Sequence, residues 1–140
     1  DSGQLPLDDH NSLQASLPSS LQGKHILVVD NDVTICEAMS QLLTQWGADV
    51  TTSLNGVQFE GEMDLSNIDL LIVDYHLDQG TGIDIAKRLI ADRSVNMPVL
   101  VVTANHSQTL NETIRQEGFS LLHKPLKPLL FRQRLRQLLG

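Results

Sequence analysis

Four polar motifs each follow directly on a short apolar run of the sequence. They are the acidic cluster at residues 30–32 (Asp-Asn-Asp), Asp74, the pair Thr103-Ala104, and Lys124 within the run His-Lys-Pro. Two carboxylates in one place attract a hard cation such as Mg²⁺, which prefers oxygen ligands and keeps several waters. A carboxylate can also act as a nucleophile, while a hydroxyl and an ammonium stabilise phosphoryl oxygens. If the fold brings these motifs together, they form a site that can accept a phosphoryl group.

Each of these residues also has a purely structural interpretation. A member of the acidic cluster could cap the helix that follows it, and Asp74 could be a turn residue. Thr103 is of a type common at strand ends, and Lys124 could be an ordinary solvated charge. Capping and metal binding can coexist. The joint occurrence of the four motifs therefore favours the functional interpretation over four unrelated structural ones.

Three histidines, His76, His106 and His123, lie in or near the same predicted loops. No two of them have the spacing that would place a pair of metal ligands on one face of a helix. Surface or hydrogen-bonding roles are therefore favoured over a zinc site.

The elements that must position these motifs alternate in type from Lys24 onward. Short apolar runs predict strands over residues 26–29, 48–52, 68–73, 99–102 and 119–122. The stretches between the runs carry apolar residues at intervals of three and four, which is typical of helices that bury one face. The first predicted helix runs from Ile35 to Trp46 and ends at Gly47, and a second helix over 57–65 is only weakly indicated. A third helix is predicted from Ile83 to about Asp92, and a short fourth one around Leu110 and Ile114. The last predicted helix carries Leu129, Leu130, Leu135, Leu138 and Leu139.

Five alternating units of this kind predict an α/β fold with a doubly wound, five-stranded parallel sheet. Right-handed crossovers are strongly favoured, so the helices are expected to cover both faces of the sheet. In such sheets ligands bind outside the carboxyl ends of the strands, where loops that are distant in sequence meet. The four polar motifs all follow strands and are therefore expected at this one edge.

Composition excludes several other classes of protein. The net charge is -7 with a pI of about 5.0, and the ten Lys and Arg residues are scattered, so direct binding to nucleic acid is not expected. No apolar stretch approaches the roughly 20 residues that cross a bilayer, and no membrane contact is expected. The lone Cys36 lies within an apolar-periodic run, which indicates a small packed side chain in a reducing, cytoplasmic setting.

The first 23 residues are rich in Ser, Gln, Asp, Gly and Pro and show no sustained period, so we interpret 1–23 as a linker or tail and 24–140 as the folded domain. An interdomain helix is the alternative for this segment, although Pro6 and Pro18 argue against a long one. The leucines that such a helix would use are Leu5, Leu7, Leu13, Leu17 and Leu21.

Together these motifs resemble a known family, the CheY-like receiver domains of response regulators and hybrid histidine kinases. Residues 26–32 (ILVVDND) are similar to the first strand and acidic cluster of that family, and residues 71–77 (LIVDYHL) to its phosphoacceptor strand. Gly82 falls where the family has a loop glycine, and residues 101–104 (VVTA) match its switch-threonine strand. Lys124 and Pro125 match the lysine of the family and the proline that follows it. The resemblance runs from Lys24 to about Leu139 and implies the flavodoxin-like (βα)5 fold.

The resemblance also implies a role for each motif. Asp74 would accept a phosphoryl group from a phosphohistidine on a histidine kinase or a histidine phosphotransfer domain, and the domain itself would promote phosphorylation and dephosphorylation. The phosphoryl group would be bound by Thr103, the Ala104 amide and Lys124. Mg²⁺ or Mn²⁺ would be held by Asp74, Asp30, Asn31 and the backbone carbonyl of His76. The bond before Pro125 is expected to be cis.

Two positions depart from the family pattern. Asn31 stands at the second acidic position, so the cation would meet one formal charge fewer and is expected to bind more weakly. Leu121, three residues before Lys124, stands where many members have a rotating aromatic residue, so phosphorylation is expected to cause a smaller or different change of surface.

The sequence leaves open which kind of longer protein contains this domain. The linker and the absence of a DNA-binding domain after Gly140 favour the C-terminal receiver of a hybrid sensor kinase that is itself membrane-bound, and the missing initial Met indicates a piece of a longer protein. A stand-alone regulator and an N-terminally extended one are alternatives, and a weak homodimer is left open.

The main functional alternative is a pseudo-receiver that docks a partner through its fourth and fifth helices without phosphorylation. A phosphatase or small-ligand domain on the same fold is disfavoured, since no general acid neighbours Asp74.

Overall fold

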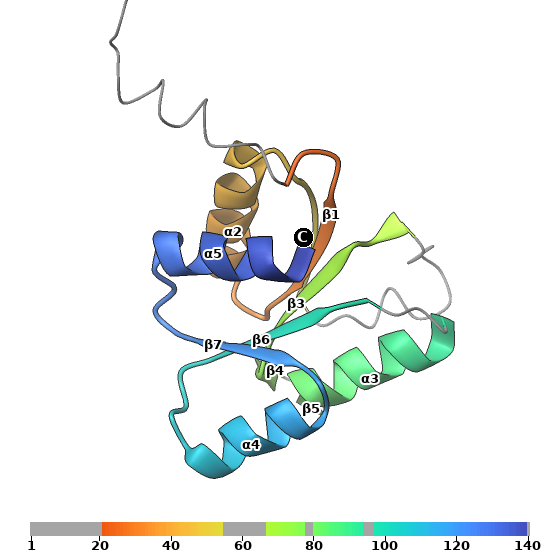
Figure 1. The fold of residues 1–140 in the computed structure, drawn as a ribbon, viewed down its shortest axis with the longest axis vertical. Coiled ribbons are helices and arrows are strands. Elements are labelled where there is room, and N and C mark those ends of the chain that lie inside the picture. Colours follow the sequence, from red (N-terminus) through yellow and green to blue (C-terminus); the bar gives the residue numbers. More distant parts are fainter. Residues whose placement is uncertain (1–20, 55–66, 78–79, 94–96, 140) are drawn as a thin grey trace, which may run out of the picture.

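The computed structural model describes residues 21–54, 67–77, 80–93 and 97–139. Its centre is a five-stranded parallel sheet with the strand order β2-β1-β3-β6-β7 (Figure 1). This order confirms the predicted doubly wound sheet. The strands are β1 (His25–Val29), β2 (Asp49–Ser53), β3 (Leu70–Asp74), β6 (Val99–Thr103) and β7 (Ser120–His123).

Helices cover both faces of the sheet, as the right-handed crossovers require. Helices α2 (Val33–Gln45) and α5 (Pro128–Leu139) lie on one face, where the rings of Trp46 and Phe131 are 5.8 Å apart. On the other face lie α3 (Gly82–Arg93) and α4 (Gln108–Gln116) (Figure 1). The second helix predicted over 57–65 falls outside the described residues.

Strands β1, β3, β6 and β7 contribute to two cores because successive side chains point to opposite faces. In β3, Leu71 and Val73 face the α3 and α4 side, while Leu70 and Ile72 face the α2 and α5 side, and all four are buried. A strand that is covered on both faces has no polar side, which explains why the sequence shows continuous apolar runs instead of alternation. Burying one such side chain contributes roughly 1.5–3 kcal/mol.

The boundaries of α2 follow from its end residues. Asp32 is the N-cap, and its side chain accepts a hydrogen bond from the Thr34 amide at 2.9 Å. The helix ends before Gly47, whose φ of 98° is a left-handed conformation that favours glycine. The stop predicted at Gly47 is confirmed, and the cap is the third residue of the acidic cluster.

Three local features differ from the sequence-based expectations. Asp74 and Thr103 do not follow their strands but are the last residues of β3 and β6, because the chain goes on pairing there: the Tyr75 amide donates to the Val102 carbonyl at 2.9 Å. A small antiparallel pair, β4 (His76–Leu77) and β5 (Gly80–Thr81), was not predicted, since two-residue strands have no period to detect. Leu21, assigned to the tail, is fully buried in the core between α2 and α5.

Cys36 is buried, with 5% of its surface exposed, and this confirms the predicted small packed side chain. Within the described part of the chain, no helix has the length and apolar character needed to cross a membrane.

Candidate functional site

Three strands bring two carboxylates and one ammonium together at the carboxyl edge of the sheet. Asp30 directly follows β1, Asp74 ends β3, and Lys124 directly follows β7. The Lys124 Nζ lies 2.9 Å from Asp74 Oδ1 and 3.3 Å from Asp30 Oδ2. The side chains of Asp30 and Asp74 are 2% and 8% exposed, whereas that of Lys124 is 24% exposed. We call these three residues the charged triad; their juxtaposition at one edge is what the sequence predicted.

Asp30 is held in place from several directions. Its Oδ1 accepts a hydrogen bond from the Asp32 amide at 2.9 Å, and its own amide donates to the Ser53 carbonyl at 3.0 Å. The Cys36 thiol donates to the Asp30 carbonyl at 3.2 Å, a supporting role that no sequence motif indicates. Burial, with a smaller contribution from the charge of Asp74, raises the pKa of Asp30, although the Asp32 amide and Lys124 oppose this shift.

The ammonium of Lys124 is stabilised by the carboxylates on which it lies. Burial alone would lower the pKa of Lys124, but the hydrogen bond and charge of Asp74, together with those of Asp30, outweigh burial and raise it. The Lys124 amide also donates to the Thr103 carbonyl at 2.8 Å, which joins the end of β7 to the end of β6. The Lys124-Pro125 peptide bond is cis, as predicted. A permanent positive charge is thus fixed beside Asp74.

Thr103 and Ala104 begin the loop that leads from β6 to α4. Thr103 is fully buried, and its hydroxyl oxygen accepts a hydrogen bond from the Asn105 amide at 3.0 Å. Because the hydroxyl acts as an acceptor in this bond, its hydrogen can still be donated to an anion. Ala104 is exposed. Thr103 is one residue beyond Val102, the register partner of Asp74, so this loop leaves the sheet at the same edge as the charged triad.

Gly82 packs directly against the backbone that carries Asp74. A Cβ at this position would clash with the Asp74 carbonyl oxygen and lie 3.0 Å from Val73 Cγ2, so a side chain cannot be added without moving β3. The Gly82 amide donates to the Tyr75 carbonyl at 2.8 Å. The glycine that the sequence comparison with the receiver family singled out therefore allows the close approach of α3 to the end of β3.

The residues at this edge fit a hard divalent cation. One ammonium contacts both Asp30 and Asp74, which means that their carboxylates converge within reach of a single positive charge. The described residues contain no group of three His, Cys, Asp or Glu side chains that could hold a metal, so the remaining ligands would come from amide and carbonyl oxygens and water. Asn31 and His76, the residues expected to supply those oxygens, are both exposed, while Asp32 caps α2.

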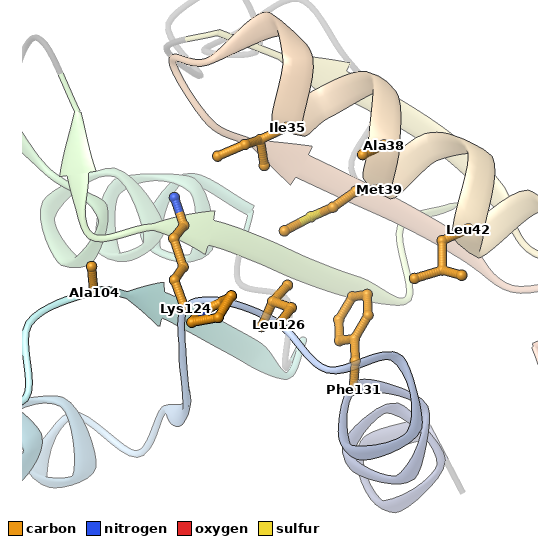
Figure 2. Close-up of a pocket in the computed structure, with 9 residues that line it drawn as sticks. Ile35, Ala38, Met39, Leu42, Ala104, Lys124, Leu126 and Phe131 are labelled. Carbon is orange, nitrogen blue, oxygen red and sulfur yellow. The ribbon is translucent and has the colours of Figure 1, made fainter.

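An apolar pocket of about 510 Å³ lies next to the charged triad, between α2 and the chain that leads from β7 into α5 (Figure 2). Lys124 forms one side of it, and Figure 2 shows its nitrogen directed away from the apolar lining. The lining residues are Ile35, Ala38, Met39, Leu42, Ala104, Lys124, Pro125, Leu126 and Phe131. The acidic site thus borders a surface that can take up apolar side chains.

Known proteins share both the sequence pattern and the fold. The family model of the response regulator receiver domain matches residues 26–136. The transcriptional regulatory protein ZraR of Klebsiella oxytoca is 33% identical over 102 residues, which are 72% of this chain and 23% of ZraR. The regulatory protein VirG of Agrobacterium tumefaciens is 25% identical over 115 residues, which are 81% of this chain and 42% of VirG. The chain thus spans less than half the length of these curated relatives.

Solved structures agree with the fold. The chemotaxis protein CheY4 of Vibrio cholerae has a TM-score of 0.72 at 24% identity, with 83% of this chain and 98% of that chain covered. The HemR receiver domain of Leptospira biflexa has a TM-score of 0.75 at 23% identity, with 84% and 94% covered. Since the family model matches well over half of the residues, the chain belongs to the response regulator receiver domain family.

Proposed function

We propose that this receiver domain accepts a phosphoryl group on Asp74 from a phosphohistidine of a histidine kinase or a histidine phosphotransfer domain, in a reaction that depends on Mg²⁺ or Mn²⁺. The observation that carries the proposal is the contact of the Lys124 ammonium with Asp74 at 2.9 Å and with Asp30 at 3.3 Å. A buried carboxylate with a fixed cation beside it is suited to transfer in which positioning and charge stabilisation do most of the work.

In the proposed reaction an Asp74 carboxylate oxygen forms a bond to phosphorus while the bond from phosphorus to the donor imidazole nitrogen breaks. Lys124 stabilises the phosphoryl oxygens, and the Thr103 hydroxyl and the Ala104 amide donate hydrogen bonds to them. Asp30, Asn31, Asp74 and the backbone carbonyl of His76 would hold the divalent cation. When bound, that cation neutralises charge on the phosphoryl group and on the carboxylates.

The donor must bring its phosphoimidazole to the charged triad, and the apolar pocket beside Lys124 offers contact area for it. Partly exposed side chains such as Ile35 and Leu126 can bury apolar groups of the partner beside Lys124. Phosphorylation then alters the loop after β6 and the surface of α4, which a further partner reads.

The domain is proposed to span residues 24–140, with 1–23 as a linker, and to act in the cytoplasm. The buried Leu21 indicates that the last residues of the linker pack against the domain. The protein context proposed for it is the receiver of a hybrid sensor histidine kinase.

Phosphate incorporation tests the acceptor assignment. The chain is incubated with a small phosphodonor and Mg²⁺, and acid-labile phosphate is measured. We expect incorporation that is lost in Asp74→Asn and on removal of divalent cations with a chelator. Asp84→Asn is the matched control, because Asp84 is an exposed carboxylate at the start of α3, and it should be phosphorylated normally. Unchanged incorporation in Asp74→Asn would contradict the assignment.

The pseudo-receiver remains the second candidate because of Asn31 and Leu121. Leu121 is half-buried against the core on the α3 and α4 side, so it fills apolar space where a rotating ring would need room to move. Binding of beryllofluoride, a phosphoryl analogue, separates the two functions: a pseudo-receiver would not bind it in the presence of Mg²⁺, and the proposed acceptor would.

A further inference from the structure

Two histidines from separate segments stack on each other beside the charged triad. The imidazole rings of His106 and His123 have centroids 4.3 Å apart and planes inclined by 12°. His106 lies in the loop between β6 and α4, and His123 is the last residue of β7. Since one ring belongs to a loop and the other to a strand, the stack joins the loop to the sheet.

The strand residue of this pair is directly linked to the proposed phosphoryl-binding groups. His123 is the register partner of Thr103, and it immediately precedes Lys124. The Lys124 amide in turn donates to the Thr103 carbonyl at 2.8 Å. The backbone of His123 is therefore held next to both Thr103 and Lys124, the two residues whose side chains would contact the phosphoryl group.

The loop itself is held by short local hydrogen bonds. The Asn105 amide donates to the Thr103 hydroxyl at 3.0 Å, the Ser107 amide to Asn105 Oδ1 at 2.8 Å, and the Leu110 amide to Ser107 Oγ at 3.3 Å. These three bonds connect the loop to itself and to α4. Residues 104–109 are exposed, so burial contributes little to fixing the loop, and a contact with β7 has a correspondingly large influence.

The ring of His123 is held by the stack and not by a hydrogen bond of its buried Nε2. Its Nε2 is buried and has no hydrogen-bond partner among the described residues. On its loop side this ring packs face to face against His106, and the same contact holds His106 against the end of β7.

We propose that His106 and His123 are positioning residues: their stack clamps the loop after β6 in the conformation in which the Thr103 hydroxyl and the Ala104 amide bind the phosphoryl group. This inference rests on the proposed phosphoacceptor function. The expected cation ligands Asp30 and Asp74 lie on other strands and do not belong to the loop. Opening the stack should therefore weaken binding of the phosphoryl group without changing the affinity for the cation.

The test compares two affinities in the full chain, that for Mg²⁺ alone and that for beryllofluoride at saturating Mg²⁺, each measured by calorimetry. His106→Ala should weaken beryllofluoride binding about fivefold, as expected for the loss of one ring contact. Its Mg²⁺ affinity should stay within twofold. His106→Phe keeps a ring on His123 and should restore beryllofluoride binding. Gln108→Ala, a nearby exposed change on α4, is the matched control and should alter neither affinity.

Hydrogen exchange gives a readout that does not need the ligand. In His106→Ala the Asn105 and Ser107 amides should exchange faster than in the unmodified chain, and His106→Phe should bring the rates back. Equal weakening of both affinities, unchanged beryllofluoride binding in His106→Ala, or failure of His106→Phe to restore it would overturn the inference. No beryllofluoride binding by the unmodified chain would instead overturn the proposed function, and the inference with it.

Discussion

The charged triad and the loop after β6 lie at the same edge of the sheet, but they are held in different ways. Asp30 and Asp74 are buried, and the triad is joined by ion pairs between strands that are distant in sequence. The loop from Ala104 to Ser107 is exposed and is held by local hydrogen bonds and one ring stack. The triad therefore forms whenever the sheet forms, whereas the loop can change its conformation while the sheet stays intact.

Removing the cation of the triad should have the largest effect on stability. Lys124→Met leaves two buried carboxylates side by side, and we expect a loss of roughly 3 kcal/mol in the free energy of unfolding at pH 7. The raised pKa of Lys124 means that its stabilisation is fully present below its ordinary pKa of about 10.5 and is lost only as the pH rises through the raised value. Urea denaturation at pH 7 measures the loss; a variant as stable as the unmodified chain would contradict the triad as a stabilising unit.

Gly82→Ala tests how closely α3 approaches the triad. The added methyl clashes with the Asp74 carbonyl, so β3 or α3 must shift, at a cost of about 2 kcal/mol. Thermal unfolding should report this loss, and phosphorylation of Asp74 should slow because the acceptor moves. Thr81→Ala, one residue earlier, provides the control and should lose less. Normal phosphorylation in Gly82→Ala would show that the acceptor tolerates displacement.

Thr103→Val tests the loop after β6, the second of the two regions compared. The change keeps the volume but removes the hydroxyl that accepts the Asn105 amide, and we expect a loss of about 1 kcal/mol in stability. Beryllofluoride affinity should fall about tenfold, while Mg²⁺ affinity should not change. Thr103→Ser retains the hydroxyl and should bind almost normally. A parallel loss of Mg²⁺ affinity would mean that the loop and the triad are not independent.

Asp30→Asn should have the smallest effect, and with the opposite sign. Because burial raises the pKa of Asp30, the folded state binds its proton more tightly than the unfolded state, and stability falls as the pH rises from the ordinary value of 3.8 through the raised value. Replacing the carboxylate should stabilise the chain by less than about 1 kcal/mol at pH 7, and the stabilisation should be smaller still at acid pH. Thermal unfolding at both pH values measures the difference, and Mg²⁺ affinity should drop. Lower stability at pH 7 would refute the sign.

The sheet and the triad could be predicted from the sequence because the central strands β1, β3 and β6 are continuous apolar runs, each of which ends in or is followed by a polar residue. Which residue of the acidic cluster caps α2 and which one joins the triad could not be predicted, because all three residues are of types suited to capping. The path of the backbone places Asp32 at the start of α2 and Asp30 at the edge of the sheet. The stack of His106 on His123 could not be predicted either, because the two residues belong to different segments and no sequence period relates them. Leu21 is buried because it packs against residues of α2 and α5. Its neighbours in the sequence are polar and show no period, so the sequence did not indicate this burial.

The position of β7 has a consequence for the order in which the site is completed. This strand is at one border of the sheet and is the last to leave the ribosome, yet it delivers the ammonium that neutralises Asp30 and Asp74. A chain cut short before residue 124 would keep both acids without their counter-ion. Under the proposed function, the site that accepts the phosphoryl group is therefore completed only when synthesis of the domain is nearly finished.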